Sequence, residues 1–154
     1  RENIIIALQA KRGMFHPLSK KEMEEAADKY IKLLQIKTAS RETPIKSLSG
    51  GNQQKAIIGR EIGLDPDLLI AVQPTRGLDV GSIEYIHKRL VQERDNDKAV
   101  LLVSLELSEV MNLADRIAIV NGGELIGVVN ASDTNENEIG LMMAGVHKGG
   151  TKHD

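Results

Sequence analysis

The chain has 154 residues, with 20 Lys and Arg against 22 Asp and Glu, a formal net charge of −2 and an aromatic content of 2%. This length suits one globular domain, and the balanced charge argues against a surface that binds nucleic acid or an anionic membrane. Cysteine is absent, which excludes disulfides, thiolate metal sites and cysteine nucleophiles. No run of about 18 apolar residues occurs, so we expect no direct membrane insertion.

Residues 1–47 are expected to be mostly helical. Ser19 and Glu22 have the spacing of a capping box at a helix start, and apolar residues then recur at three- and four-residue spacing. The members of this apolar face are Met23, Ala26, Ala27, Tyr30, Ile31 and Leu34. The polar segment 38–44 ends in proline, which predicts a linker between the helical part and the rest of the chain.

From residue 48 onward, predicted helices alternate with short apolar runs. One helix is predicted over residues 50–63, and a second carries Ile83, Ile86, Leu90 and Val91 on one face. The apolar runs that follow these helices cover residues 68–72 and 99–103. Because the runs lack polar alternation, they predict strands covered on both faces, as in a mostly parallel sheet flanked by helices. The predicted fold class is therefore α/β.

The last third of the chain predicts a hairpin and a short helix. Two apolar runs, 117–120 and 125–129, flank the turn sequence Asn121-Gly122-Gly123. A short helix is expected over residues 136–144, and the polar residues 149–154 are expected to form a flexible tail.

The most informative segment, residues 47–55, reads Ser-Leu-Ser-Gly-Gly-Asn-Gln-Gln-Lys. At a helix start, the two glycines after Ser49 would expose backbone N–H groups at the positive end of the helix dipole and let a phosphate approach closely. The alternative is that Ser49 is only an N-cap with flexible glycines beside it. That alternative would be preferred for a bare Ser-Gly-Gly, but the Asn-Gln-Gln-Lys that follows makes the longer string much less expected by chance.

A second segment, residues 68–79, reads as a strand that runs into a turn containing Pro74, Gly77 and Asp79. Ligands of open α/β sheets bind beyond the carboxyl ends of the strands, where residues 73–79 would lie. The same residues can build the turn and cap the next helix, and the two roles are compatible.

Together, the string Leu-Ser-Gly-Gly-Asn-Gln-Gln-Lys and the later Gln-Pro-Thr-Arg-Gly-Leu-Asp-Val resemble the ATP-binding domain of ABC transporters. The form of both motifs looks most like the second ATP-binding domain of the simple-sugar and nucleoside importers, in which two such domains are fused in one polypeptide. The resemblance covers nearly the whole chain. It implies a partial P-loop NTPase-like core (residues 48–148, starting with the signature helix), a helical subdomain (1–47) and a flexible tail (149–154).

The chain also departs from this family. No G-x-x-x-x-G-K-[ST] phosphate loop occurs, so the chain resembles the C-terminal part of a longer protein. Val72 and Gln73 stand where the family has an aspartate that orders the magnesium shell and a glutamate that activates water, and neither can do that chemistry. Leu105 stands where the family has a histidine against the γ-phosphate. We therefore expect a degenerate hydrolytic site with no competent catalytic residue.

The resemblance implies that this half acts in trans through its signature motif. Ser49 and the N–H groups of Gly50 and Gly51 would contact the γ-phosphate of ATP held by a partner nucleotide-binding domain, and Asn52 and Gln53 would add polar contacts. Mg²⁺ would be held mainly by the missing phosphate loop or by the partner domain.

Further partners follow from the same resemblance. Asp79 matches the family's aspartate at the seam between the two ATP-binding domains, and residues 1–47 match the part that contacts transmembrane permease subunits. The complete protein is expected to be an ATPase at the cytoplasmic face of the cell membrane, and this chain alone to be inactive. In this family, the permease and an external binding protein select the transported substrate, so this chain does not reveal whether it is a sugar or a nucleoside.

Two alternatives differ in class. This half could be a catalytically silent structural or regulatory module that holds the dimer and permease interface, a reading that the departures favour and the complete signature motif opposes. An independent small-molecule enzyme has little support, because no nucleophile stands with a paired base. The four histidines are scattered without ligand spacing, so no metal site is predicted; they are His16, His87, His147 and His153.

Overall fold

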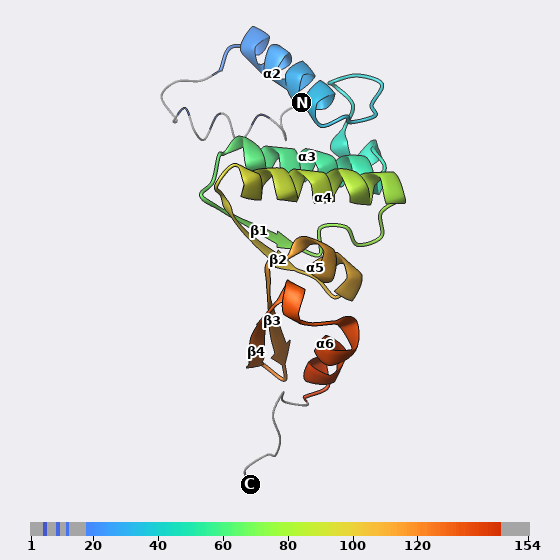
Figure 1. The fold of residues 1–154 in the computed structure, drawn as a ribbon. Coiled ribbons are helices and arrows are strands. Elements are labelled where there is room, and N and C mark those ends of the chain that lie inside the picture. Colours follow the sequence, from blue (N-terminus) through green and yellow to red (C-terminus); the bar gives the residue numbers. More distant parts are fainter. Residues whose placement is uncertain (1–4, 6–8, 10–11, 13–17, 146–154) are drawn as a thin grey trace. The chain divides into compact units, whose positions relative to one another are not determined.

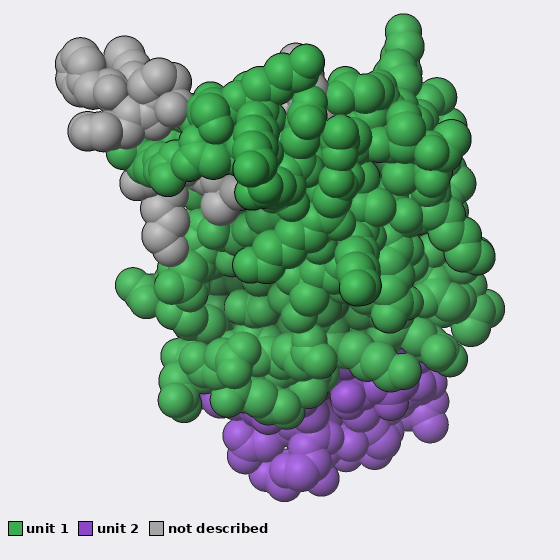
Figure 2. All heavy atoms as spheres, turned by 90° about the horizontal axis from the view of Figure 1, so that it is seen from above, with its two compact units in different colours: residues 1–101 green, residues 102–154 purple. Residues whose placement is uncertain are grey.

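The computed structural model describes residues 5, 9, 12 and 18–145, which form two compact units. Figure 1 shows the course of the chain, and Figure 2 colours the two units separately. Unit 1 is Arg1–Leu101 and unit 2 is Leu102–Asp154. The predicted tail and three of the four histidines lie outside the described residues.

The first long helix of unit 1 is α2, Lys20–Leu33. It starts with the predicted capping box: Ser19 Oγ accepts from the Glu22 backbone N–H, and a Glu22 carboxylate oxygen accepts from the Ser19 N–H at 2.8 Å. These bonds to Ser19, together with the Arg12 guanidinium at 2.8 Å, lower the pKa of Glu22 to about 2. The apolar face predicted from spacing is confirmed at Ala27 and Leu34, which are buried.

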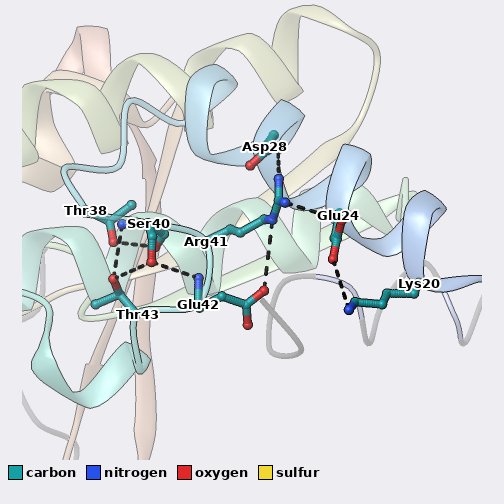
Figure 3. Close-up of polar contacts among 8 residues, drawn as sticks. All are labelled: Lys20, Glu24, Asp28, Thr38, Ser40, Arg41, Glu42 and Thr43. Atoms are coloured by element: carbon teal, nitrogen blue, oxygen red, sulfur yellow. Dashed lines mark hydrogen bonds and ion pairs between the residues drawn. The ribbon is translucent and has the colours of Figure 1, made fainter.

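The polar segment after α2 is a loop, and it is held against that helix (Figure 3). The Arg41 guanidinium reaches back to Asp28 at 2.5 Å and to Glu24 at 3.3 Å. Within the loop, Thr43 Oγ1 accepts from the Ser40 N–H. The segment predicted as a linker is thus a loop with its own polar contacts, followed by a 3₁₀ turn, Ile45–Ser47.

Helices α3, Gly50–Gly63, and α4, Val80–Asp95, lie side by side (Figure 1). A core cluster of Leu34, Ile36 and Ala56 joins the end of α2 to α3, with Tyr85 of α4 packed against it. The packing is tight at Gly59, where an added Cβ would lie 2.1 Å from a methyl carbon of Leu34. Because Leu34 is fully buried, only glycine fits at this position.

Strands β1, Leu68–Val72, and β2, Ala99–Val103, are neighbours and are connected through α4, the connectivity of a βαβ unit. Both strands lie where the apolar runs predict them. The expectation that both faces are covered is wrong for the described residues, because burial alternates along each strand. The large side chains left exposed are Leu68, Ile70, Val72, Leu101 and Val103.

Unit 2 contains the predicted hairpin, formed by β3, Arg116–Asn121, and β4, Glu124–Asn130. The strands are antiparallel, and the two glycines of the turn, Gly122 and Gly123, have φ values of 59° and 87°. Such positive angles are the reason for glycine in a two-residue hairpin turn.

The hairpin packs against the last helix, α6, Glu136–Met143, which agrees with the predicted short helix. Their shared core consists of Ile117, Ile119, Ile139 and Met142. A short 3₁₀ turn, Ala131–Asp133, leads into α6. Helix α5, Leu107–Leu113, was not predicted from the sequence.

In the part of the chain that the structure describes, no helix is long and apolar enough to cross a bilayer. The same residues contain no group of three or more His, Cys, Asp or Glu side chains that could hold a metal ion. His87 lies on α4 and is half-buried.

Candidate functional site

The signature segment, Ser49–Gln53, forms the start of α3. Ser49 is the N-cap residue, with extended φ and ψ of −61° and 155°, but its side chain accepts no backbone N–H of the first turn. Its backbone carbonyl accepts the Gln53 N–H at 2.9 Å, which closes the first turn. Ser49 therefore occupies the N-cap position without the side-chain bond of an N-cap, so its hydroxyl does not compete for the N–H groups that open this helix.

The two amide side chains of the signature segment have partners inside the chain. Asn52 Nδ2 donates to Ser49 Oγ at 2.8 Å, and Asn52 Oδ1 accepts the Lys37 backbone N–H at 2.8 Å. Gln53 Nε2 donates to the Leu48 carbonyl at 2.8 Å. These bonds fix the conformation of both side chains around the helix start.

The two glycines differ in what surrounds them. A Cβ added at Gly50 would have Leu78 as its nearest neighbour, at an ordinary 3.7 Å, and Gly50 is exposed. A Cβ added at Gly51 would lie 2.2 Å from Ser82 Oγ and 2.9 Å from Ser82 Cβ. Close packing on α4 thus requires Gly51, whereas Gly50 leaves the helix start open to an approaching ligand.

Asp79 lies beside this helix start because it caps the neighbouring helix. Its Oδ1 accepts the Ser82 backbone N–H at 3.0 Å, and its Oδ2 accepts the Ser82 hydroxyl at 2.8 Å. These bonds from Ser82, first from its hydroxyl and then from its backbone, lower the pKa of Asp79, with a smaller contribution from the charge of Lys55. Asp79 is therefore ionised and rigidly oriented near Gly51.

Ser82 is the residue of this arrangement that sequence reasoning missed. It is buried at the start of α4, where it donates two hydrogen bonds to Asp79 and leaves no room for a side chain at Gly51. The signal that could have found it is spacing: Ser82 is the third residue after the N-cap Asp79, where a capping side chain meets the backbone.

Lys55 and Tyr85 join this region to the end of α2. The Lys55 ammonium lies 4.6 Å from the centre of the Tyr85 ring and 3.5 Å from the Gln35 carbonyl. The Tyr85 hydroxyl donates to the Leu33 carbonyl at 3.4 Å, and partial burial raises the pKa of Tyr85. Three helices thus meet around the signature segment.

The end of strand β1 has a different chemical character. Val72 is 62% exposed, and Gln73 has a φ of 49°, a left-handed conformation that is unfavourable for a side chain with a Cβ. The buried residues Pro74 and Thr75 follow, and turn bonds from Arg76 N to Gln73 O and from Leu78 N to Thr75 O lead to α4. Neither Val72 nor Gln73 can ionise, so this strand end provides no general base.

Leu105, the third departure from the family pattern, lies in unit 2 directly after β2. Its side chain is 74% exposed. The adjacent Glu106 N–H donates to Ser104 Oγ at 3.0 Å, so this segment is a short turn into α5. An aliphatic side chain at this position can neither donate a hydrogen bond nor carry charge.

Solved structures identify the fold. A dimeric bacterial ABC transporter cassette, MJ0796, superposes with a TM-score of 0.65 at 25% identity, covering 75% of this chain and 50% of that chain. A nucleotide-free ATP-binding cassette from an ABC transporter superposes with a TM-score of 0.68 at 22% identity, covering 93% of this chain and 58% of that chain. The fold is therefore that of an ABC ATPase, as predicted.

Relatives by sequence are more specific. The guanosine import ATP-binding protein NupO of Bacillus subtilis is 52% identical over 149 residues, which are 94% of this chain and 29% of that protein. The nucleoside import ATP-binding protein NupA of Lactococcus lactis subsp. cremoris is 56% identical over 71% of this chain and 22% of its own length. The ribose import ATP-binding protein RbsA of Clostridium perfringens is 37% identical over 95% of this chain and 29% of its own length.

These matches confirm the predicted relationship. The chain belongs to the ATP-binding proteins of ABC transporters, and its homologues are named as ATP-binding proteins for sugar and nucleoside import. It spans less than a third of the length of these relatives. None of the protein-family models compared with the chain matches it.

Proposed function

We propose that the chain is the C-terminal part of the second nucleotide-binding domain of an ABC importer ATPase, and that it acts on ATP held by a partner domain. Ser49 and the N–H groups of Gly50 and Gly51 donate to the γ-phosphate, with Asn52 and Gln53 in the same helix turn. The observation that carries this proposal is the start of α3, where Ser49 makes no capping bond and Gly50 is exposed. Donors of this kind stabilise developing negative charge.

The other partners follow from the family. The partner nucleotide-binding domain lies in the same polypeptide, and Asp79 faces the seam between the two domains. Permease subunits hold the protein at the cytoplasmic face of the membrane. ATP is the substrate, and Mg²⁺ is held mainly by the phosphate loop or by the partner domain, because Val72 and Gln73 offer no carboxylate.

A nucleoside is the transported substrate that the comparisons favour. Two relatives named as guanosine and nucleoside import proteins are 52% and 56% identical to the chain, whereas relatives named for fructose and ribose import are 43% and 37% identical.

The direct test is a Ser49→Arg substitution in the complete subunit, assembled with its permease. The arginine blocks the helix start, and we expect ATPase turnover to fall by about 100-fold or more, the cost of losing a preorganised oxyanion donor. Ser132→Arg is the matched control, since Ser132 is exposed in the 3₁₀ turn before α6, and its turnover should stay near wild type. Unchanged turnover in Ser49→Arg would reject the role in trans.

The chain by itself should bind ATP weakly, because it has no phosphate loop. We expect a Kd no tighter than roughly millimolar, about 4 kcal/mol of binding free energy, in calorimetry. Micromolar affinity would show that the chain carries a nucleotide site of its own.

A second candidate function is a silent structural or regulatory half. The apolar and neutral side chains at Val72, Gln73 and Leu105 favour it. Restoring the family residues by Val72→Asp, Gln73→Glu and Leu105→His in the complete subunit separates the two. A rise in turnover would identify a decayed hydrolytic site, and no gain would favour the structural role.

A further inference from the structure

Asn52 occupies the centre of a hydrogen-bond chain that starts outside the signature segment. Its Oδ1 accepts the backbone N–H of Lys37, fifteen residues earlier in the loop that follows α2, and its Nδ2 donates to Ser49 Oγ, both at 2.8 Å. Half-burial on the first turn of α3 limits the rotation of the Asn52 side chain. The loop after α2 and the hydroxyl of Ser49 are therefore connected through one amide.

The direction of these bonds is fixed by their chemistry. A backbone N–H can only donate, so the group of Asn52 that faces Lys37 must be the carbonyl oxygen, and the group that faces Ser49 must be the NH₂. Ser49 Oγ consequently acts as an acceptor toward Asn52. Since a hydroxyl has one proton and two lone pairs, its proton stays free to be donated elsewhere.

This arrangement determines what Ser49 offers to a ligand. The hydroxyl makes no bond to the backbone N–H groups of its own helix, and it is held instead by the side chain of Asn52. Donation from an amide to the oxygen polarises the O–H bond and strengthens its donation to an anion. The amide also restricts the rotation of the Ser49 side chain, which lowers the entropy lost on binding.

We propose that Asn52 is a positioning residue: it holds the Ser49 hydroxyl as a hydrogen-bond donor toward the phosphate and links that hydroxyl to the loop that follows α2. The proposal rests on the function proposed for Ser49. Asn52 then acts through Ser49, and a movement of Lys37 changes the donor geometry at the phosphate. An aspartate at position 52 could accept the Lys37 N–H but would also accept the hydrogen bond of the Ser49 hydroxyl, which would then no longer donate to the phosphate.

The test is a double-mutant cycle in the complete subunit with its permease, measured as ATPase turnover. We expect Ser49→Ala to lower turnover by about 10- to 100-fold, the range for a hydrogen bond to a charged group, and Asn52→Ala to lower it by about tenfold. In the Ser49→Ala background, Asn52→Ala should change turnover less than about twofold, because the interaction it supports is already gone. Gln54→Ala, one residue beyond the signature segment, is the control and should remain near wild type.

Asn52→Asp keeps the acceptor for Lys37 and provides the second variant should Asn52→Ala fail to fold. We expect it to lower turnover when Ser49 is present and to have a smaller effect in Ser49→Ala, where only the repulsion between the carboxylate and the phosphate remains. A loss from either Asn52 variant that persists undiminished without Ser49, or no loss with Ser49 present, would overturn the positioning role. Unchanged turnover in Ser49→Ala would instead reject the proposed function of the signature segment.

Discussion

The start of α3 and the end of β1 belong to the same unit, yet they are built in opposite ways. At the start of α3, the polar side chains are held by short hydrogen bonds. The helix also packs so closely on α4 that a Cβ added at Gly51 would lie 2.2 Å from Ser82 Oγ. At the end of β1, Val72 is exposed and Gln73 has a left-handed backbone. Preorganised donors are present at the first, and no ionisable group is present at the second.

Under the proposed function, the two regions have different tasks within one fold. A helix start that presents donors needs fixed geometry, because donors that must reorganise contribute less to binding charge. A strand end without a general base needs only a turn that leads to the next helix. The fixed geometry of the signature segment and the absence of a general base at the strand end are the two observations that support the role proposed above for this half.

The largest expected effect on stability is at the start of α3, where it packs against α4. Gly51→Ala should destabilise the chain by about 1–3 kcal/mol, the usual cost of overpacking, because Ser82 Cβ cannot rotate away. Urea denaturation measures this free energy of unfolding. Gly50→Ala is the matched control and should be neutral or stabilising by up to about 1 kcal/mol, since it adds only helix propensity. Equal denaturation midpoints for the two variants would show that α3 and α4 are not in close contact.

The strand end should respond with the opposite sign. Gln73→Gly removes the Cβ that makes a φ of 49° unfavourable, so we expect stabilisation by about 1 kcal/mol in the same assay. Gln54→Gly, inside α3, should destabilise by about 1 kcal/mol because glycine weakens a helix interior. Destabilisation by both substitutions would contradict the left-handed conformation of Gln73.

The next effect is a pH dependence of stability, which we expect from Asp79 beside the start of α3. The folded-state pKa of Asp79 is lowered below its ordinary 3.8, so its contribution to stability is complete above that value and is lost as pH falls through the folded pKa. Asp79→Asn keeps a capping oxygen without titrating. We expect the melting temperatures of wild type and variant to converge below about pH 4. Glu22 titrates equally in both proteins and cancels, so a constant difference would exclude the Asp79 contribution.

The smallest effect on stability is expected in the loop that follows α2, which contains Lys37, the partner of Asn52. Arg41→Gln removes partly exposed ion pairs to Asp28 and Glu24, so the loss of stability should stay below about 1 kcal/mol and shrink with added salt. Faster hydrogen exchange at the Ser40 amide would report the loosened loop. Lys46→Gln, in the 3₁₀ turn that follows, is the control and should change neither. Unaltered exchange in Arg41→Gln would mean that Arg41 does not hold the loop on α2.

Features with short-range causes could be predicted from the sequence. The capping box of Ser19 and Glu22 depends on a three-residue spacing, and the hairpin depends on two glycines between apolar runs. The ABC ATPase fold followed from two motifs, and the comparisons confirm it. Helix α5 escaped prediction because it has only seven residues and no side-chain cap.

Burial of the strands was predicted less well. Continuous apolar runs at 68–72 and 99–103 indicated cover on both faces, but in the described chain every second residue of β1 is exposed. The sequence of a strand shows how apolar it is, whereas the burial of its two faces depends on which other elements pack against them.

The sequence by itself determined most of the local elements and suggested which residues face a phosphate, because helix caps, turns and motif spacing act over a few neighbours. Only the tertiary structure decided how these residues are held: that Gly51 meets Ser82, that Asn52 joins Lys37 to Ser49, and that Asp79 is locked beside them. The contacts of Gly51 with Ser82 and of Asn52 with Lys37 join residues 31 and 15 positions apart, and packing of α3 against α4 and the loop after α2 creates them. No periodicity along the chain encodes such distances.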